Sequence, residues 1–300
     1  MQNIENSYID RAYEEYMKGS YGEAVDLFEL SLNWYEDNRK GMLTTEDKYY
    51  EYSLMIAEMY FSIGNVYGDI YLDYDNKAKE KYTMPHAINW NKASFERMMK
   101  VNYAVAKTHY KRCIEVKPRR SEAYNEMGNI LLKLGQYSEA EKVFLKAYYL
   151  QPQNQVICNN VASCYSYRGL YNKAVPYAEK AIELSVNDLR ELEKQLKEGK
   201  EDVGSKELEG QKQALSIMNS NIAFLYLNLC DFKKAYQLYQ MAIEFYSDND
   251  NARYGITYME ENKLIPKGWV MSKIKLNNNF SLIVQIILKK IIPKQMKIRR

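Results

Sequence analysis

The sequence is poor in the residues from which most enzyme sites are built. Its 300 residues include two histidines and four cysteines. His86 and His109 do not stand at metal-binding spacing from other ligands, the cysteines show no paired spacing of metal or redox type, and no glycine-rich phosphate loop occurs. We therefore expect no catalysis, no metal and no cofactor, and we interpret all four cysteines as reduced core residues of a cytoplasmic protein.

Long apolar runs and a secretory signal are also missing. The first six residues have neither a basic end nor an apolar run. No apolar stretch reaches the roughly 20 residues that span a bilayer. With 46% apolar and 27% charged residues, the composition is ordinary for a globular or repeat protein and too hydrophobic for disorder throughout.

Acidic residues are absent from the C-terminal segment. Residues 265–300 contain nine Lys and Arg, whereas the remaining chain holds 33 basic and 39 acidic residues. The acidic balance of the main body argues against nucleic-acid binding. The segment from Phe280 to Arg300 is both apolar and basic, which is typical of a segment that lies on a membrane surface. Packing on the last repeat, contact with a partner helix and a flexible extension stay open as alternatives.

Two consecutive copies of a 34-residue pattern occupy residues 121–188. Each copy has two blocks of small and apolar residues at helical spacing. The first copy reads Tyr124-x2-Met127-Gly128-x2-Leu131, then Ala140-x3-Phe144, Ala147 and Pro152. The second reads Cys158-x2-Val161-Ala162-x2-Tyr165, then Ala174-x3-Ala178, Ala181 and Val186. We expect Gly128 and Ala140 to let the two helices approach closely, Ser138 to cap the second helix and Pro152 to end it.

This pattern resembles the tetratricopeptide repeat in its period and in its order of small, aromatic and proline positions. The resemblance implies an all-α fold, an α-α superhelix in which antiparallel helix pairs stack into a right-handed solenoid. One pair cannot bury its apolar face alone, so stability comes from stacking on neighbouring repeats.

Weaker copies of the pattern extend the predicted repeat domain over residues 1–263, followed by a basic apolar tail at 264–300. The second repeat is split, because Ala106, Tyr110 and Cys113 fit its second helix but come about 30 residues late. A second insertion carries a leucine stripe on each side of Val203-Gly204-Ser205, which predicts an antiparallel helical hairpin. The predicted parts are repeats at 5–38, 57–120 with insertion 69–98, 121–154 and 155–188, insertion 189–215, a repeat at 216–249 and a final helix at 250–263.

The resemblance also implies that the first helices of the repeats line a binding groove. Asparagine recurs at the positions that would face it, and its amide can both donate to and accept from an extended peptide backbone. The alternative is that asparagine merely covers a wet helix face. The expected peptide-binding residues are Asn65, Asn125, Asn129, Asn159, Lys133, Tyr167 and Phe224.

One subfamily grips a C-terminal carboxylate with two asparagines and three cations. Asn129 and Asn160 match the asparagines, but Asn125, Ile217 and Asn221 replace the cations, so the strong charge-assisted bonds would be lost. We expect instead a non-catalytic scaffold that binds a peptide or helical segment of a partner protein. The alternatives are an adaptor held at a membrane surface by its tail, and a structural subunit that self-associates through residues 189–215.

Overall fold

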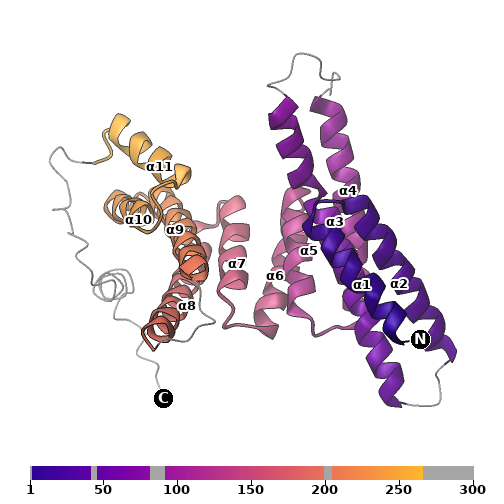
Figure 1. The fold of residues 1–300 in the computed structure, drawn as a ribbon. Coiled ribbons are helices and arrows are strands. Elements are labelled where there is room, and N and C mark those ends of the chain that lie inside the picture. Colours follow the sequence, from indigo (N-terminus) through magenta and orange to yellow (C-terminus); the bar gives the residue numbers. More distant parts are fainter. Residues whose placement is uncertain (1, 42–45, 82–91, 199–204, 266–300) are drawn as a thin grey trace. The chain divides into compact units, whose positions relative to one another are not determined.

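Eleven α-helices and no strands make up the described part of the chain. The computed structural model describes residues 2–41, 46–81, 92–198 and 205–265 (Figure 1). The helices are α1 (Gln2–Met17), α2 (Tyr21–Gly41), α3 (Glu46–Lys81), α4 (Lys92–Val116), α5 (Ser121–Lys133), α6 (Tyr137–Leu150), α7 (Gln155–Tyr167), α8 (Tyr171–Lys197), α9 (Ser205–Asn228), α10 (Phe232–Phe245) and α11 (Asp250–Glu261). The predicted all-α class is confirmed.

The chain divides into two compact units, Met1–Leu150 and Gln151–Arg300. In the N-terminal unit each of the helices α1 to α5 packs on the helix that follows it, and α3 also contacts α5. In the C-terminal unit the helices from α7 to α11 follow the same rule, and α9 also contacts α7 and α11. Each of α2, α4, α8 and α10 therefore packs on the helix before it and on the helix after it, as stacked repeats require.

Each unit has its core between these packed helices. The largest fully buried side chains of the N-terminal unit are Phe28, Ile56, Met59, Ile63, Leu131 and Phe144. Those of the C-terminal unit are Ile157, Leu189, Leu215, Ile222, Leu238 and Met259. Burial of such side chains supplies most of the stability, at about 1.5–3 kcal/mol for each.

Small residues let buried rings lie directly against a neighbouring helix. A Cβ atom added to Gly128 on α5 would lie 2.6 Å from Cε1 of Phe144 on α6, and one added to Gly64 on α3 would lie 2.8 Å from Cε1 of Tyr110 on α4. The first contact confirms the close approach expected of Gly128. The second shows that α3 and α4 pair as the displaced pattern around Tyr110 predicts.

A residue in the left-handed region closes the turn between the two helices of four repeats. Gly19, Gly135 and Gly169 have φ angles of 79°, 72° and 70°, which a residue without Cβ adopts at little cost. Cys230 takes the same place between α9 and α10 with a φ of 60°, and its side chain is exposed. The prediction of four core cysteines is therefore wrong for Cys230, whereas the other three are buried.

The ends of α6 test two predictions about local structure. The helix begins at Tyr137, so Ser138 lies inside it and the prediction that Ser138 is the N-cap is wrong. The carbonyl of Gln136 instead accepts from the N–H groups of Glu139 and Ala140, at 3.1 and 3.0 Å. The helix ends at Leu150, before Pro152, as expected.

Both predicted insertions are helical where they are described. The first continues α3 and starts α4, and the second continues α8 and starts α9. The amide nitrogen of Gln211 on α9 donates to the carbonyl and hydroxyl oxygens of Ser185 on α8, at 3.1 and 3.2 Å, so these two helices are tied near the base of the hairpin. His86 and the segment from Phe280 to Arg300 lie outside the described residues.

Candidate functional site

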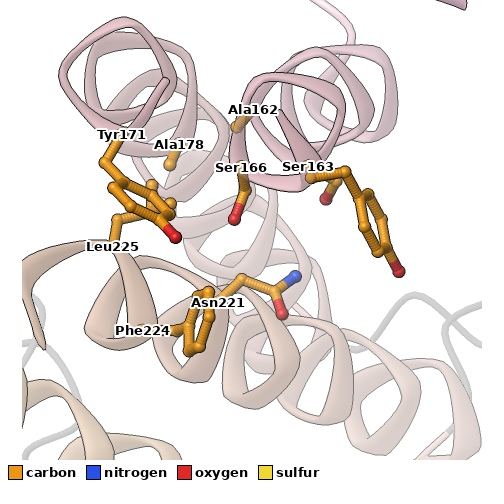
Figure 2. A pocket seen from close by; sticks show the side chains of 9 residues that line it. Ala162, Ser163, Ser166, Tyr171, Ala178, Asn221, Phe224 and Leu225 are labelled. Carbon is orange, nitrogen blue, oxygen red and sulfur yellow. The ribbon is translucent and has the colours of Figure 1, made fainter. Parts of the chain in front are cut away.

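A pocket of about 440 Å³ opens among α7, α8 and α9 in the C-terminal unit (Figure 2). It includes two of the predicted binding residues, Tyr167 and Phe224. The nine lining residues carry no charge; they are Ala162, Ser163, Ser166, Tyr167, Tyr171, Ala178, Asn221, Phe224 and Leu225. Pockets that combine apolar walls with a few polar groups are the usual form of a binding site.

The lining changes from apolar and buried to aromatic and exposed. Ala162, Ala178 and Leu225 are only 4%, 3% and 2% exposed, whereas Tyr167 and Phe224 are 67% and 45% exposed. The buried side chains form the floor of the pocket and the exposed rings belong to its rim. The ring of Tyr171 meets that of Phe224 edge to face, with centroids 6.3 Å apart, so α8 and α9 share one side of this rim.

Polar groups of the pocket come from all three helices: the serine hydroxyls from α7, the Tyr171 phenol from α8 and the Asn221 amide from α9. Figure 2 shows the Ser166 hydroxyl directed into the space above Asn221. The amide nitrogen of Asn221 donates to Oδ1 of Asn159 at 3.3 Å, which ties α9 to α7 beside the pocket. The predicted residue Asn159 therefore supports the wall of the pocket and does not line it.

A partly buried polar cluster connects α8, α9 and α10 next to the pocket. The Tyr226 hydroxyl donates to Oε1 of Glu179 at 2.6 Å, and the Lys234 ammonium lies 3.4 Å from the same oxygen. Burial, reinforced by the Glu179 carboxylate, raises the pKa of Tyr226 well above its usual range. The phenol therefore stays protonated and keeps donating at any ordinary pH.

The other predicted asparagines belong to the N-terminal unit and are engaged there. The Asn125 side chain is 4% exposed, and its amide nitrogen donates to Oε1 of Glu126 at 2.9 Å. Asn129 donates to Oε2 of the same carboxylate at 3.0 Å. Oδ1 of Asn65 accepts from the Tyr110 hydroxyl at 2.8 Å. Asn125 thus offers little surface to a ligand, whereas Asn65 and Asn129 stay partly accessible.

Two carboxylates, those of Asp69 and Glu126, lie near the predicted binding residues of the N-terminal unit. Tyr16 donates a hydrogen bond to Asp69, and Glu126 accepts from both amides named above. Burial lowers the pKa of Lys133, and the nearby carboxylates of Asp69 and Glu126 act in the opposite direction. The Lys133 ammonium also lies 5.0 Å from the ring centroid of Tyr103. Asp69 and Glu126 are two residues that the sequence-based site lacks.

The described residues hold no group of three or more His, Cys, Asp or Glu side chains that could bind a metal ion. His109 instead packs between two rings of α3, with centroids 5.9 Å from Tyr60 and 6.0 Å from Tyr67. None of the helices in the ranges that the structure describes is long and apolar enough to cross a membrane.

Comparison with protein families matches the two strongest repeats. Family models described as tetratricopeptide repeat match residues 121–154 and 156–187. The helix pair α5–α6 lies in the first range, and the second range covers α7 from residue 156 and the part of α8 up to residue 187. This chain is a tetratricopeptide-repeat protein.

Relatives of this tetratricopeptide-repeat protein are distant. The BBSome complex member BBS4 of Mus musculus is 26% identical over 153 residues, which is 50% of this chain and 24% of the mouse protein. The chain thus matches about a quarter of that relative's length. The pilF structure of Pseudomonas aeruginosa is 13% identical, covers 98% of this chain and 94% of its own, and gives a TM-score of 0.50. The structure of a thermophilic TPR protein in Thermus thermophilus is 15% identical over 86% and 99% of the two chains, with a TM-score of 0.47.

The positions of a carboxylate clamp are occupied differently in this tetratricopeptide-repeat protein. Asn221, which stands where a clamp has a cation, bonds to Asn159 and lines the pocket. Ile217 is an exposed apolar side chain on the same helix. In the C-terminal unit the clamp positions therefore offer amide and apolar groups, and no guanidinium or ammonium group.

Sequence reasoning found only part of the pocket lining. It named Tyr167 and Phe224 from their repeat positions, but it gave Ala178 and Tyr171 no role in the binding site. The signal was present, because Ala178 stands where the preceding copy of the pattern has Phe144.

Proposed function

We propose that this tetratricopeptide-repeat protein is a non-catalytic scaffold of the cytoplasm. It binds a peptide or helical segment of a partner protein against the first helices of its repeats. The observation that carries this proposal is the uncharged pocket of about 440 Å³ among α7, α8 and α9, with the exposed rings of Tyr167 and Phe224 at its rim. Exposed aromatic side chains around a pocket are typical of sites where proteins bind one another.

The polar rim supports binding of a peptide in particular. Ser163, Ser166 and Asn221 offer hydroxyl and amide groups next to an apolar floor. Such groups can pair with peptide N–H and C=O groups of any sequence, while the floor takes an apolar side chain. In the N-terminal unit, Asn65, Asn129 and Lys133 are the proposed peptide-binding residues, and Asn125 would support Asn129 through Glu126.

The mouse relative fits the same role. BBS4 is named as a member of the BBSome complex, so the matched 153 residues belong to a protein that works in an assembly. For the present chain we propose association with a protein partner and leave the composition of any assembly to experiment.

Selection of peptides tests the proposal without knowledge of the partner. The full chain is immobilised and exposed to displayed random 12-residue peptides, and enriched peptides are measured against the double variant Tyr167→Ala/Phe224→Ala. We expect affinity to fall by about tenfold or more, since each truncation removes an exposed ring that contributes contact area. The control is Tyr254→Ala, which truncates an exposed ring on α11. Failure to enrich any peptide, or equal affinity of both variants, would overturn the proposal.

A second candidate function rests on the composition of the C-terminal segment. Nine basic and no acidic residues in 265–300, with an apolar stretch from Phe280 to Ile292, favour contact with an anionic membrane surface. Flotation with vesicles containing phosphatidylserine compares the full chain with a chain that ends at Lys263. Membrane contact predicts that only the full chain floats, and equal flotation rules it out.

A further inference from the structure

The pocket lies where this fold normally places a buried aromatic ring. The second helix of each predicted repeat carries a fully buried alanine, and four residues later an aromatic ring in all repeats but the fourth. The four pairs are Ala24 and Phe28, Ala106 and Tyr110, Ala140 and Phe144, and Ala235 and Tyr239, all buried. In the fourth repeat Ala174 is followed by Ala178, which lines the pocket.

Tyr110 shows what such a ring does when it is present. It packs with Ile130 in one buried cluster, so the ring fills the junction between α3, α4 and the next first helix, α5. A Cβ atom on Gly64 would collide with it, which shows how completely that space is occupied. At the corresponding junction of α7, α8 and α9, Leu225 takes the place of Ile130 and Ala178 that of Tyr110. The lining alanines and Leu225 therefore surround the volume that a ring would occupy.

We propose that the partner segment supplies this missing ring. The inference rests on the proposed function and names the side chain that the pocket binds, an uncharged aromatic ring, with phenylalanine preferred to tyrosine. A cavity of about 150 Å³ holds a benzene ring, so about 440 Å³ has room for a ring and part of the backbone that carries it. A charged side chain would meet no counter-charge among the nine lining residues and would lose its hydration.

The preference for phenylalanine follows from the direction of entry. A ring that enters past the exposed Tyr167 and Phe224 places its tip against Ala162, Ala178 and Leu225. A tyrosine hydroxyl would then be buried beside apolar side chains without a partner, which is unfavourable. Ser163, Ser166 and Asn221 are partly exposed, so they lie nearer the rim, where they can bond the peptide backbone.

The decisive variant is Ala178→Phe, in which the protein's own phenylalanine ring fills the pocket. Its folding is expected because the first and fifth repeats already combine alanine at the facing position with a buried ring: Ala12 with Phe28 and Ala223 with Tyr239. The matched control is Asn172→Phe, which adds the same ring at an exposed position of α8 outside the pocket. Thermal unfolding of both variants verifies that they fold.

Three probes are titrated into the full chain and followed by saturation-transfer NMR: N-acetyl-phenylalaninamide, N-acetyl-tyrosinamide and N-acetyl-lysinamide. We expect the phenylalanine probe to bind at least about fivefold more tightly than the other two. Ala178→Phe should weaken its binding by about tenfold or more, and Asn172→Phe should leave it unchanged. If Ala178→Phe does not fold, Phe224→Ala, which truncates an exposed rim residue, replaces it with an expected loss of about threefold or more.

Two results would overturn the inference: equal binding of the three probes, or unchanged binding of the phenylalanine probe to a folded Ala178→Phe chain. The proposed function has a separate outcome. If selected peptides lack aromatic residues and still bind Ala178→Phe, the proposed scaffold function holds and the proposal that the pocket binds an aromatic ring is wrong. If the phenylalanine probe binds but no peptide can be selected, the pocket does bind an aromatic ring and the proposed scaffold function is wrong.

Discussion

Gly128 and Phe144 are in such close contact that no side chain fits at position 128 while the ring stays in place. A Cβ atom on Gly128 would approach three ring carbons of Phe144 to between 2.6 and 2.8 Å, and the ring is fully buried between α5 and α6. The same relation joins Gly64 with Tyr110 in α3 and α4. In these two helix pairs, packing thus depends on a glycine on one helix and a ring on the other.

Gly128→Ala should lower the free energy of unfolding by about 1–3 kcal/mol, because the rigid ring has no space into which it can move. Gly210→Ala is the matched control. Gly210 lies in α9 with nothing within 4 Å of an added Cβ, so alanine should stabilise the chain by about 0.5–1 kcal/mol through its helix propensity. Urea titrations followed by circular dichroism measure both. Shifts of the same sign would contradict the packing described here.

Cys230→Gly should stabilise the protein by about 0.5–1 kcal/mol, since the φ of 60° strains any residue that has a Cβ atom. Gly169→Cys makes the reverse change in the equivalent turn and should destabilise by a similar amount. Differential scanning calorimetry compares the two midpoints. A lower midpoint for Cys230→Gly would show that the cysteine side chain makes a compensating contact.

Alkaline pH should destabilise the chain through its buried thiols. Burial raises the pKa of Cys164 from 9.0 to about 11. Below pH 9 the thiol is neutral in both states, so its burial costs nothing. Between pH 9 and 11 the unfolded chain loses the proton first, and stability falls, by about 2 kcal/mol at pH 11. Unfolding of Cys164→Ala, measured from pH 8 to 11, should show a correspondingly smaller decline. Identical declines would contradict the raised pKa.

The exposed Cys230 should also react faster than the other cysteines. The native chain should label rapidly at one thiol with a disulfide reagent, and the urea-unfolded chain at all four, because only thiolates that solvent reaches are attacked. Cys230→Ser should abolish the fast phase. A second rapid thiol in this variant would show that a buried cysteine is accessible.

Asn249→Ala should weaken the attachment of α11 to α9 and destabilise the protein. The Asn249 side chain caps α11 by accepting from the N–H of Ala252 at 2.9 Å, and it donates to the hydroxyls of Ser216 and Ser220 at 2.8 and 3.1 Å. We expect a loss of about 2–3 kcal/mol, against about 1 kcal/mol for Asn154→Ala, whose side chain caps α7 and makes one further, exposed bond, to Oε1 of Gln151 at 3.3 Å. Amide exchange in α11 should rise in Asn249→Ala alone. Unchanged exchange there would contradict the role of the network.

Period and spacing were sufficient to predict the helices and most of their pairing. The pattern Ala106, Tyr110 and Cys113 located the displaced second helix of the split repeat because a buried ring and small residues recur at fixed spacing. Local features were less predictable. Ser138 is a favourable cap residue, yet the helix begins at Tyr137, since packing of the whole turn decides where a helix starts.

For the candidate site, too, repeat position was predictable from the sequence and local side-chain contacts were not. Repeat position alone indicates that Tyr167 and Phe224 lie near a binding surface, and both line the pocket. It does not reveal that Glu126 accepts hydrogen bonds from Asn125 and Asn129. Whether a neighbouring carboxylate takes up an amide donor depends on the side-chain rotamers, which repeat position does not give. Ala178, which lines the pocket, is smaller than the ring that stands at the same position of the other repeats.

Site-specific photocrosslinking tests the central claim most directly. Benzoylphenylalanine is placed at Ser166, on the rim of the pocket, or at Glu183, an exposed position of α8 outside the pocket lining. Each chain is irradiated with a biotin-labelled peptide from the display selection. The account predicts strong crosslinking from position 166 and little from position 183. Equal crosslinking from both, or stronger crosslinking from 183, would show that the partner segment binds a surface other than the first helices of the repeats.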